Sequence, residues 1–379
     1  MYKKSNIFFI SLFIIFFIVI GIFLIRSSND TNSIQNRSAY KYNKFTIKDF
    51  LSGELQSNIE DATSDQLPLY NYYQLLYPTV KNNINCSYID ACNLDRNTYA
   101  DMGSGLNLYK GYLVYNPLGE EDLKSYDNYI NKINYISENI SSNFYIYYVN
   151  SDQNIRLDKY NKTDCDTYIR DRITIPSNHF SSLKINSFDD YSKYFLKLDH
   201  HFTNEGVYQE YNDLYKLLGL NNKLEKTNTI CFNKNKVYGS KSKSLALENK
   251  LVEKMCVDEF NLPNYKITIN GEESSYGATI EELKELDYIS YATIYGADYA
   301  EIIIENDETL SNKSLLIYSN SFSNGVNKLL ASHYKYTYVI DGRHTNGFNM
   351  IDYVNSHNID DVLVISSKIL FNDVIEWGD

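Results

Sequence analysis

An acid and two adjacent histidines stand together near the middle of the chain, at Asp199, His200 and His201. In an extended segment alternate side chains share a face, so Asp199 and His201 should point the same way and His200 the opposite way. A carboxylate beside an imidazole fixes the tautomer of the ring and raises its basicity, as a general base requires. In the competing interpretation the segment only begins a helix, with Thr203 as its N-cap and the histidines packed.

A serine that could act as a nucleophile lies much further along the chain. Ser321 falls in the polar run 319–325, between a predicted buried strand at 314–318 and a predicted helix at 326–333. A strand, turn and helix in this order lift a hydroxyl above the sheet and aim the free N–H groups of the helix start at it. Those groups could stabilise a developing oxyanion. Alternatively, Asn320 and the serines of the run only cap the helix.

The elements that must position these residues alternate between helices and strands. A helical apolar period over residues 123–140 leads into a continuous β-prone run at 143–149, which is typical of a strand buried on both faces. The same alternation is expected near the C-terminus, with strands at 300–305, 336–340 and 361–365 and a helix at 350–356. This order predicts an α/β protein with reactive groups at the carboxyl ends of its strands.

The N-terminus carries an apolar run at residues 7–25. A run of this length can cross the hydrocarbon core of a bilayer as a helix. Lys3 and Lys4 precede it and only Arg26 follows closely, so residues 1–6 are expected in the cytoplasm and the remainder outside. A cleaved signal peptide is the alternative, but the end of the run offers no small-residue cleavage site. We therefore predict an uncleaved signal anchor.

The remainder of the chain is predicted to form one extracytoplasmic domain over residues 45–379, joined to the anchor by a polar linker at 26–44. Residues 221–289 are less regular, with a Lys/Ser-rich stretch and short strand candidates such as 265–269. This segment is expected to be an insertion, or inserted lobe, between two halves of the domain.

Charge and cysteine content exclude some classes of partner and cofactor. The 379 residues carry a formal net charge of −12, and no Lys/Arg cluster follows the first few residues, which argues against a nucleic-acid partner. Five cysteines cannot all pair. Cys86 and Cys92 are close enough for a small disulfide loop, or they are two independent packed thiols. No Cys/His spacing suits a zinc site, and no metal is expected.

Two blocks of the sequence resemble a known family. Residues 199–206 resemble the signature of the bacterial DHHW family, with Phe202 in place of the usual Trp. The family's later block is a strand, then Asp-Ser-aromatic-x-Asn, then a helix. Residues 315–324 resemble it, with Asn320 in place of Asp. Looser similarity extends over most of the chain from about residue 45. The family is similar to the SGNH-like proteins that O-acetylate alginate and other exopolysaccharides.

The resemblance implies a three-layer α/β/α fold of the SGNH-hydrolase type with a mostly parallel sheet. It implies Ser321 as nucleophile, His201 as general base and Asp199 as the acid that orients the histidine. His200, Phe202 and Thr203 complete the same motif. Backbone N–H groups at Ser321, helped by Asn324 or Arg343, would stabilise the oxyanion, and Asn320 is expected with them among the oxyanion and substrate-binding residues. Asn320 keeps the hydrogen-bonding capacity of the usual Asp but loses its charge, which is tolerable if that Asp is not catalytic.

The function implied is transfer of an acyl group, most simply acetyl, to or from hydroxyls of a cell-surface or secreted polysaccharide. No metal or organic cofactor is implied. An integral-membrane acyltransferase that brings acetyl across the membrane is the expected donor partner. The same residues would serve an esterase that removes acetyl groups. A decayed site would instead leave a glycan-binding or assembly protein, and the sequence leaves these alternatives open.

Overall fold

The computed structural model describes most of the chain from residue 97 onward and parts of the N-terminal region. The described residues are 10–19, 31–32, 37–38, 40–41, 46–66, 76, 80, 97–159, 161–162, 164–233, 236–237, 239–245, 253–345 and 347–367. They divide into two compact units. The first comprises Met1–Cys92 and Lys243–Leu247, and the second comprises Asn93–Ser242 and Glu248–Asp379.

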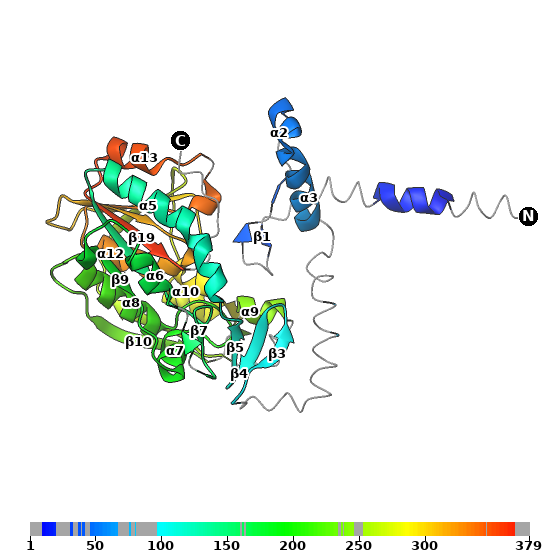
Figure 1. The fold of residues 1–379 in the computed structure, drawn as a ribbon, viewed down its shortest axis with the longest axis horizontal. Coiled ribbons are helices and arrows are strands. Elements are labelled where there is room, and N and C mark those ends of the chain that lie inside the picture. The colour runs from blue at the N-terminus through cyan, green and yellow to red at the C-terminus, as the bar shows by residue number, and fades with distance from the viewer. Residues whose placement is uncertain are drawn as a thin grey trace, which may run out of the picture. The chain divides into compact units, whose positions relative to one another are not determined.

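The first unit is built from short elements, drawn in blue in Figure 1. Helix α2 (Ile47–Ser52) begins at Thr46, whose side chain accepts the Asp49 N–H, and it ends at Gly53 with φ of 82°. Helix α3 (Glu54–Gln66) follows. A small antiparallel pair, β1 (Thr31–Asn32) and β2 (Arg37–Ser38), precedes them.

Two predictions for the N-terminal region concern residues that the structure describes in part or not at all. Of the predicted membrane span at 7–25, residues 10–19 are described, and they are helical. Among the described residues no helix is both long enough and apolar enough to cross a bilayer. Cys86 and Cys92 lie outside the described residues, so their predicted alternatives stay predictions.

The second unit is organised around a mixed sheet of eight described strands in the order β14-β13-β16-β18-β17-β19-β6-β9. Four neighbouring pairs, from β18 to β9, are parallel, and the three pairs from β14 to β18 are antiparallel. Their bounds are β6 (Asn143–Tyr148), β9 (Phe180–Ser182), β13 (Tyr265–Ile269), β14 (Glu272–Glu273), β16 (Glu301–Asn306), β17 (Ser314–Tyr318), β18 (Tyr336–Ile340) and β19 (Asp361–Ser366). The mostly parallel sheet that was predicted is therefore present, with an antiparallel extension.

Helices cover both faces of this sheet because its central strands are apolar on both sides. In β17, Leu315 and Ile317 pack into one cluster of buried side chains, and Leu316 and Tyr318 pack into the other. Figure 1 shows α5 and α13 together over one face. The helices of that face are α5 (Asp127–Asn139), α6 (Cys165–Arg170) and α13 (Met350–His357), and those of the other are α7 (Phe188–Tyr194), α8 (Asn204–Leu217), α11 (Tyr291–Tyr295) and α12 (Asn327–Ala331).

The remaining described elements are smaller. One group of antiparallel strands comprises β3 (Ala100–Gly103), β4 (Leu106–Tyr109) and β5 (Tyr112–Tyr115), and three strand pairs are β10 (Lys226–Phe232) with β12 (Met255–Phe260), β7 (Ile155–Arg156) with β8 (Asn161–Lys162), and β11 (Lys236–Val237) with β15 (Tyr288–Ile289). Two short helices are α9 (Ser240–Ser244) and α10 (Ile280–Glu285). The 3-10 turns are η1 (Glu120–Tyr126), η2 (Ser177–His179), η3 (Ser321–Ser323) and η4 (Gly342–His344). These elements carry several of the residues that surround the candidate site.

The predicted insertion at 221–289 contains two different kinds of structure. Strands β10 and β12 pair with each other, joined by a disulfide between Cys231 and Cys256. Strand β13, by contrast, pairs with β16 and extends the main sheet. The strand predicted at 265–269 is therefore present, but as part of the sheet of the domain.

Candidate active site

Three predicted side chains form one hydrogen-bonded row at the carboxyl end of β17. His201 Nε2 lies 2.7 Å from Ser321 Oγ, and His201 Nδ1 lies 2.6 Å from Asp199 Oδ1. Asp199 and His201 are buried, whereas Ser321 is partly exposed at the end of the row. An ionised carboxylate can only accept, so the ring donates Nδ1–H to Asp199 and leaves Nε2 to accept the Ser321 hydroxyl proton.

Ser321 is held by the turn that directly follows β17. Asn320 is extended, with φ of −108° and ψ of −162°, and its Oδ1 accepts the Phe322 N–H at 3.1 Å. This contact caps η3, whose first residue is Ser321. An aspartate oxygen could accept the same N–H, so Asn320 can fill the capping part of that role without a charge. The capping and nucleophile interpretations of this turn are therefore compatible.

The Asp-His-His segment is a bend, and the predicted direction of His200 is wrong. Asp199 Oδ1 accepts the backbone N–H of His201 at 3.0 Å as well as its ring N–H, which closes a tight local turn. In this turn the His200 and His201 rings lie on the same side, with centroids 3.9 Å apart. His200 Nδ1 is hydrogen-bonded to Ser240 Oγ at 2.8 Å. The strand alternation on which the prediction depended is absent here.

Burial and neighbouring charges set the protonation of the row. Burial by itself would raise the pKa of Asp199, but the attraction of His201, its hydrogen bond and the Ser240 N–H hold that pKa well below its usual range. Burial, together with repulsion from His201, lowers the pKa of His200 to about 3. Asp199 is therefore ionised and His200 is neutral at physiological pH.

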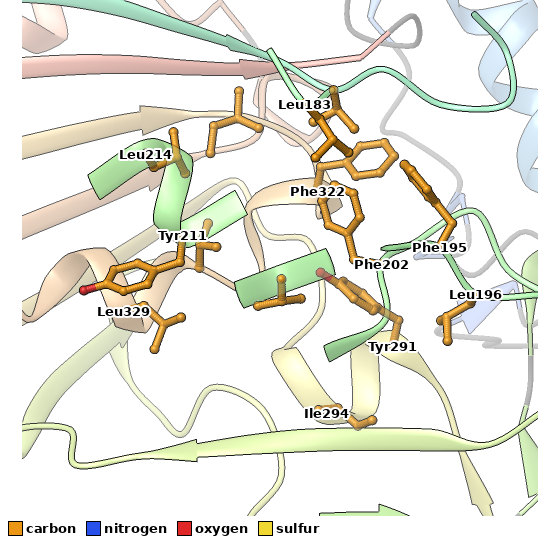
Figure 2. Close-up of a cluster of buried hydrophobic side chains, with 14 of the residues drawn as sticks. Leu183, Phe195, Leu196, Phe202, Tyr211, Leu214, Tyr291, Ile294, Phe322 and Leu329 are labelled. Carbon is orange, nitrogen blue, oxygen red and sulfur yellow. The ribbon is translucent and has the colours of Figure 1, made fainter. Parts of the chain in front are cut away.

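Aromatic side chains enclose the row. Tyr291 of α11 stacks on the His201 ring with centroids 4.2 Å apart and planes 3° from parallel. Phe202, at the position of the family's Trp, is buried and packs against Phe322 with centroids 5.3 Å apart. Figure 2 shows Phe202 and Phe322 side by side, with Tyr291 near them. Phe202 thus supports the turn that carries Ser321 by packing against Phe322, which an aromatic ring other than indole can also do.

Thr203 and Tyr291 both lie near the row, but only Thr203 belongs to a sequence motif. Thr203 was predicted as a helix N-cap, and its Oγ1 accepts the Gly206 N–H at 3.1 Å at the start of α8. Gly206 itself allows a close approach, since a Cβ there would lie 2.2 Å from Tyr194 O. Tyr291, in contrast, was not predicted. No motif marks it, because its contact with His201 joins residues that are far apart in the sequence.

Asn324 and Arg343 belong to a separate polar network. The Asn324 amide donates to Gly296 O at 3.0 Å and to Asp298 Oδ1 at 2.9 Å. The Arg343 guanidinium donates to Asp298 Oδ2 at 2.7 Å and forms an ion pair with Asp341. Both Asn324 amide hydrogens are thus engaged in this arrangement, and the charge of Arg343 is balanced by two carboxylates. The part predicted for Asn324 and Arg343 in stabilising the oxyanion stays a prediction.

Two groups of described residues bring potential metal ligands within 4.8 Å of one another. One is Asp199, His200 and His201, and the other is Asp298, Asp341 and His344. In the first, Asp199 already accepts three N–H groups. In the second, both carboxylates are paired with Arg343. Each carboxylate of the two groups thus already has protein partners.

The fold and the row define an α/β protein with a serine, histidine and aspartate site. No protein-family model matches the chain, and no curated protein matches its sequence. Solved structures do match. PatB1 of Bacillus cereus, in a structure with a sulfonyl adduct, is 20% identical with a TM-score of 0.58 over 74% of this chain and 100% of that chain.

A second solved structure carries the family name to which the motifs point. A DHHW family protein from Eubacterium siraeum is 14% identical, with a TM-score of 0.57 over 74% of this chain and 96% of that chain. Another structure of Bacillus cereus PatB1 has a TM-score of 0.53 at 18% identity, over 70% of this chain and 96% of that chain. The chain thus shares the mixed α/β fold of PatB1 and of a DHHW family protein.

Proposed function

We propose that this chain is an acyltransferase that moves an acetyl group onto a hydroxyl of a cell-surface or secreted polysaccharide. Ser321 is the nucleophile, His201 the general base and Asp199 the residue that orients and stabilises the histidine. The 2.6 Å and 2.7 Å contacts that join the three groups support this reaction. The site needs no metal for it, because a serine activated in this way attacks an ester directly.

The reaction has two half-steps. In the first, His201 Nε2 takes the Ser321 proton as Oγ attacks the carbonyl carbon of the acyl donor. The donor alcohol then leaves with that proton, and an acetyl-serine remains. In the second, His201 takes a proton from a sugar hydroxyl as that oxygen attacks the acetyl carbon, and His201 returns the proton to Ser321 Oγ as the acetylated sugar leaves. In both half-steps the Asp199 carboxylate stabilises the imidazolium.

The oxyanion formed in each half-step is assigned to the backbone. The Phe322 N–H is already accepted by Asn320 Oδ1, and the Asn324 amide is engaged with Gly296 and Asp298. The backbone N–H of Ser321, at the start of η3, is therefore the donor that we assign to the oxyanion.

We place this chemistry outside the cytoplasm, with the chain anchored by residues 7–25 and an integral-membrane acyltransferase as the donor partner. The apolar run with lysines before it supports the anchor. The Cys231–Cys256 disulfide supports an oxidising compartment, because such bonds persist mainly in secreted and cell-surface proteins. A polysaccharide acceptor would be met on the same side of the membrane.

The test supplies purified full-length protein with an activated acetyl ester and oligosaccharide acceptors, and measures acetylated sugar by mass spectrometry. Ser321→Ala and His201→Ala should each abolish transfer, and the double variant should be hardly slower than either, since the groups act as one unit. Ser323→Ala is the matched control, because Ser323 is a buried serine of the same turn whose Oγ only donates to Asn320 O at 3.3 Å.

The outcomes separate the alternatives. Acetylated sugar that depends on Ser321 supports a transferase. Release of acetate alone, with the same dependence on Ser321, would instead show an esterase. A wild-type protein that is no faster than Ser321→Ala with any acceptor would refute an enzymatic role and leave a glycan-binding protein.

A further inference from the structure

The backbone that leads into Asp199 is held by a carboxylate from a distant segment. Glu253 Oε1 accepts the Lys197 N–H at 2.5 Å, and Glu253 Oε2 accepts the Leu198 N–H at 3.0 Å. One side chain thus binds two successive N–H groups, directly before the acid of the row. Hydrogen bonds of this kind, from N–H groups to an ionised acceptor, are stronger than neutral ones.

Other contacts hold the next peptide unit and the Asp199 side chain. Leu198 O accepts the Ser242 N–H at 3.1 Å, and Asp199 Oδ2 accepts the Ser240 N–H at 2.7 Å. Gly239 permits this packing, because a Cβ there would lie 2.2 Å from Leu198 O. These partners are backbone N–H groups, which other residue types would also supply. Apart from the Asp199 carboxylate itself, the side chain on which these contacts depend is that of Glu253.

We propose that Glu253 is a positioning residue for the reaction, which holds the backbone so that the Asp199 carboxylate keeps its hydrogen bonds to His201. The inference rests on the proposed function of the Ser321 site. The Asp199 carboxylate must accept three N–H groups at once, two from His201 and one from Ser240. A small rotation of the preceding peptide units would break that arrangement. Small displacements of catalytic groups lower rates strongly even when the displaced contact is remote from the chemistry.

The protonation of Glu253 gives this role a pH dependence. The pKa of Glu253 is raised from its usual 4.5 to about 7, chiefly by burial and also by the charge of Asp199. The two backbone N–H groups and the charge of Lys197 oppose that increase. The carboxylate, present above this pH, accepts both N–H groups. The protonated acid carries a hydrogen on one oxygen and can accept only one of them well, so the backbone of Lys197 and Leu198 is held less firmly at lower pH.

The test compares full-length wild type with Glu253→Gln, which keeps the shape of the side chain but offers one acceptor oxygen in place of two. Phenylmethanesulfonyl fluoride serves as the probe, since its reaction requires only an activated serine. Ser321 Oγ attacks sulfur, fluoride leaves and His201 takes the proton. The rate of adduct formation is followed by intact mass, with Ser321→Ala as the blank.

Glu308→Gln is the matched control. Glu308 Oε1 also accepts a backbone N–H, from Asn264 at 3.0 Å, in the loop that precedes β17, whereas Ser321 follows β17. Glu253→Gln should slow sulfonylation roughly tenfold, as expected for removal of one hydrogen bond to a charged group. Glu308→Gln should leave the rate unchanged within about twofold. The rate loss in Glu253→Gln should also be larger above pH 7 than near pH 5.

A second readout separates this inference from the proposed function. The His201 Nδ1 proton, shared with Asp199 at 2.6 Å, should give a downfield proton resonance that does not depend on turnover. Glu253→Gln should shift or broaden that resonance, and Glu308→Gln should not. If wild type reacts no faster than Ser321→Ala, the proposed function fails while the resonance still tests Glu253. An unchanged resonance and an unchanged sulfonylation rate in Glu253→Gln would overturn the positioning role.

Discussion

Replacing Asp199 by Asn changes one atom of the row, and the structure indicates how the new amide would settle. Asp199 Oδ1 accepts two donors from His201, the backbone N–H at 3.0 Å and the ring N–H at 2.6 Å. Oδ2 accepts one donor, the Ser240 N–H at 2.7 Å. The amide should keep its oxygen where two donors point and turn its NH₂ group toward Ser240, because this orientation leaves fewer donors unsatisfied.

This orientation preserves the tautomer of His201 but removes the charge that stabilises the imidazolium. Two unit charges about 4 Å apart attract by about 4 kcal/mol at an effective dielectric of 20, which corresponds to roughly a 10³-fold loss in turnover. If the amide turned the other way, His201 would carry its proton on Nε2 and face Ser321 as a donor. A wrong tautomer of this kind costs about 10⁴-fold. We therefore expect Asp199→Asn to lower kcat by a factor of roughly 10³ to 10⁴.

The assay is steady-state hydrolysis of p-nitrophenyl acetate, with Ser321→Ala subtracted as background. Asp360→Asn is the control for the chemical change alone, since Asp360 Oδ2 accepts the Ser314 N–H at 2.7 Å at the other end of β17. The control should retain wild-type kcat. A loss below about tenfold in a folded Asp199→Asn protein would contradict the electrostatic role of Asp199, because the estimate from charge alone is far larger.

Three further predictions concern stability. Lys241→Met should lower the free energy of unfolding by about 3–5 kcal/mol in urea denaturation, because it leaves Asp152 buried without its 2.7 Å partner, and a loss below about 1 kcal/mol would contradict this. Replacing both Cys231 and Cys256 by Ser removes a cross-link between residues 25 positions apart. This change should lower the free energy of unfolding by about 3 kcal/mol, while turnover stays within a few fold of wild type. Folded protein keeps a proton on Glu253 between pH 4.5 and about 7 that unfolded chain releases, so the contribution of this residue to unfolding free energy falls as pH rises through that range. Glu253→Gln should remove that slope in urea titrations at several pH values, and an unaltered slope would refute the assignment.

The strands of the parallel half of the sheet could be predicted from local sequence. A strand buried on both faces reads as an unbroken apolar run, and the runs predicted at 143–149 and 314–318 correspond to β6 (Asn143–Tyr148) and β17 (Ser314–Tyr318). The helix predicted at 123–140 corresponds to η1 followed by α5 (Asp127–Asn139). Apolar periodicity locates such a helix, but it does not distinguish a 3-10 first turn from an α-helix.

The antiparallel extension and the disulfide could not be predicted in the same way. The residues at 265–269 were expected to be a strand, but nothing local indicated that this strand would pair with β16. Cys231 and Cys256 become neighbours because they are opposite each other in the pairing of β10 with β12. Cysteine positions along a chain leave many pairings open, and strand register decides among them.

The identities of Asp199, His201 and Ser321, and the order of strand, turn and helix around Ser321, were determined by the sequence itself, because residue chemistry and local backbone preference act over a few positions. Tertiary structure alone brought Ser321 within 2.7 Å of His201 across 120 residues. It also placed Tyr291 on the histidine ring and engaged Asn324 with Asp298. Even the side of the bend on which His200 lies depends on contacts with distant Ser240, which no local periodicity contains.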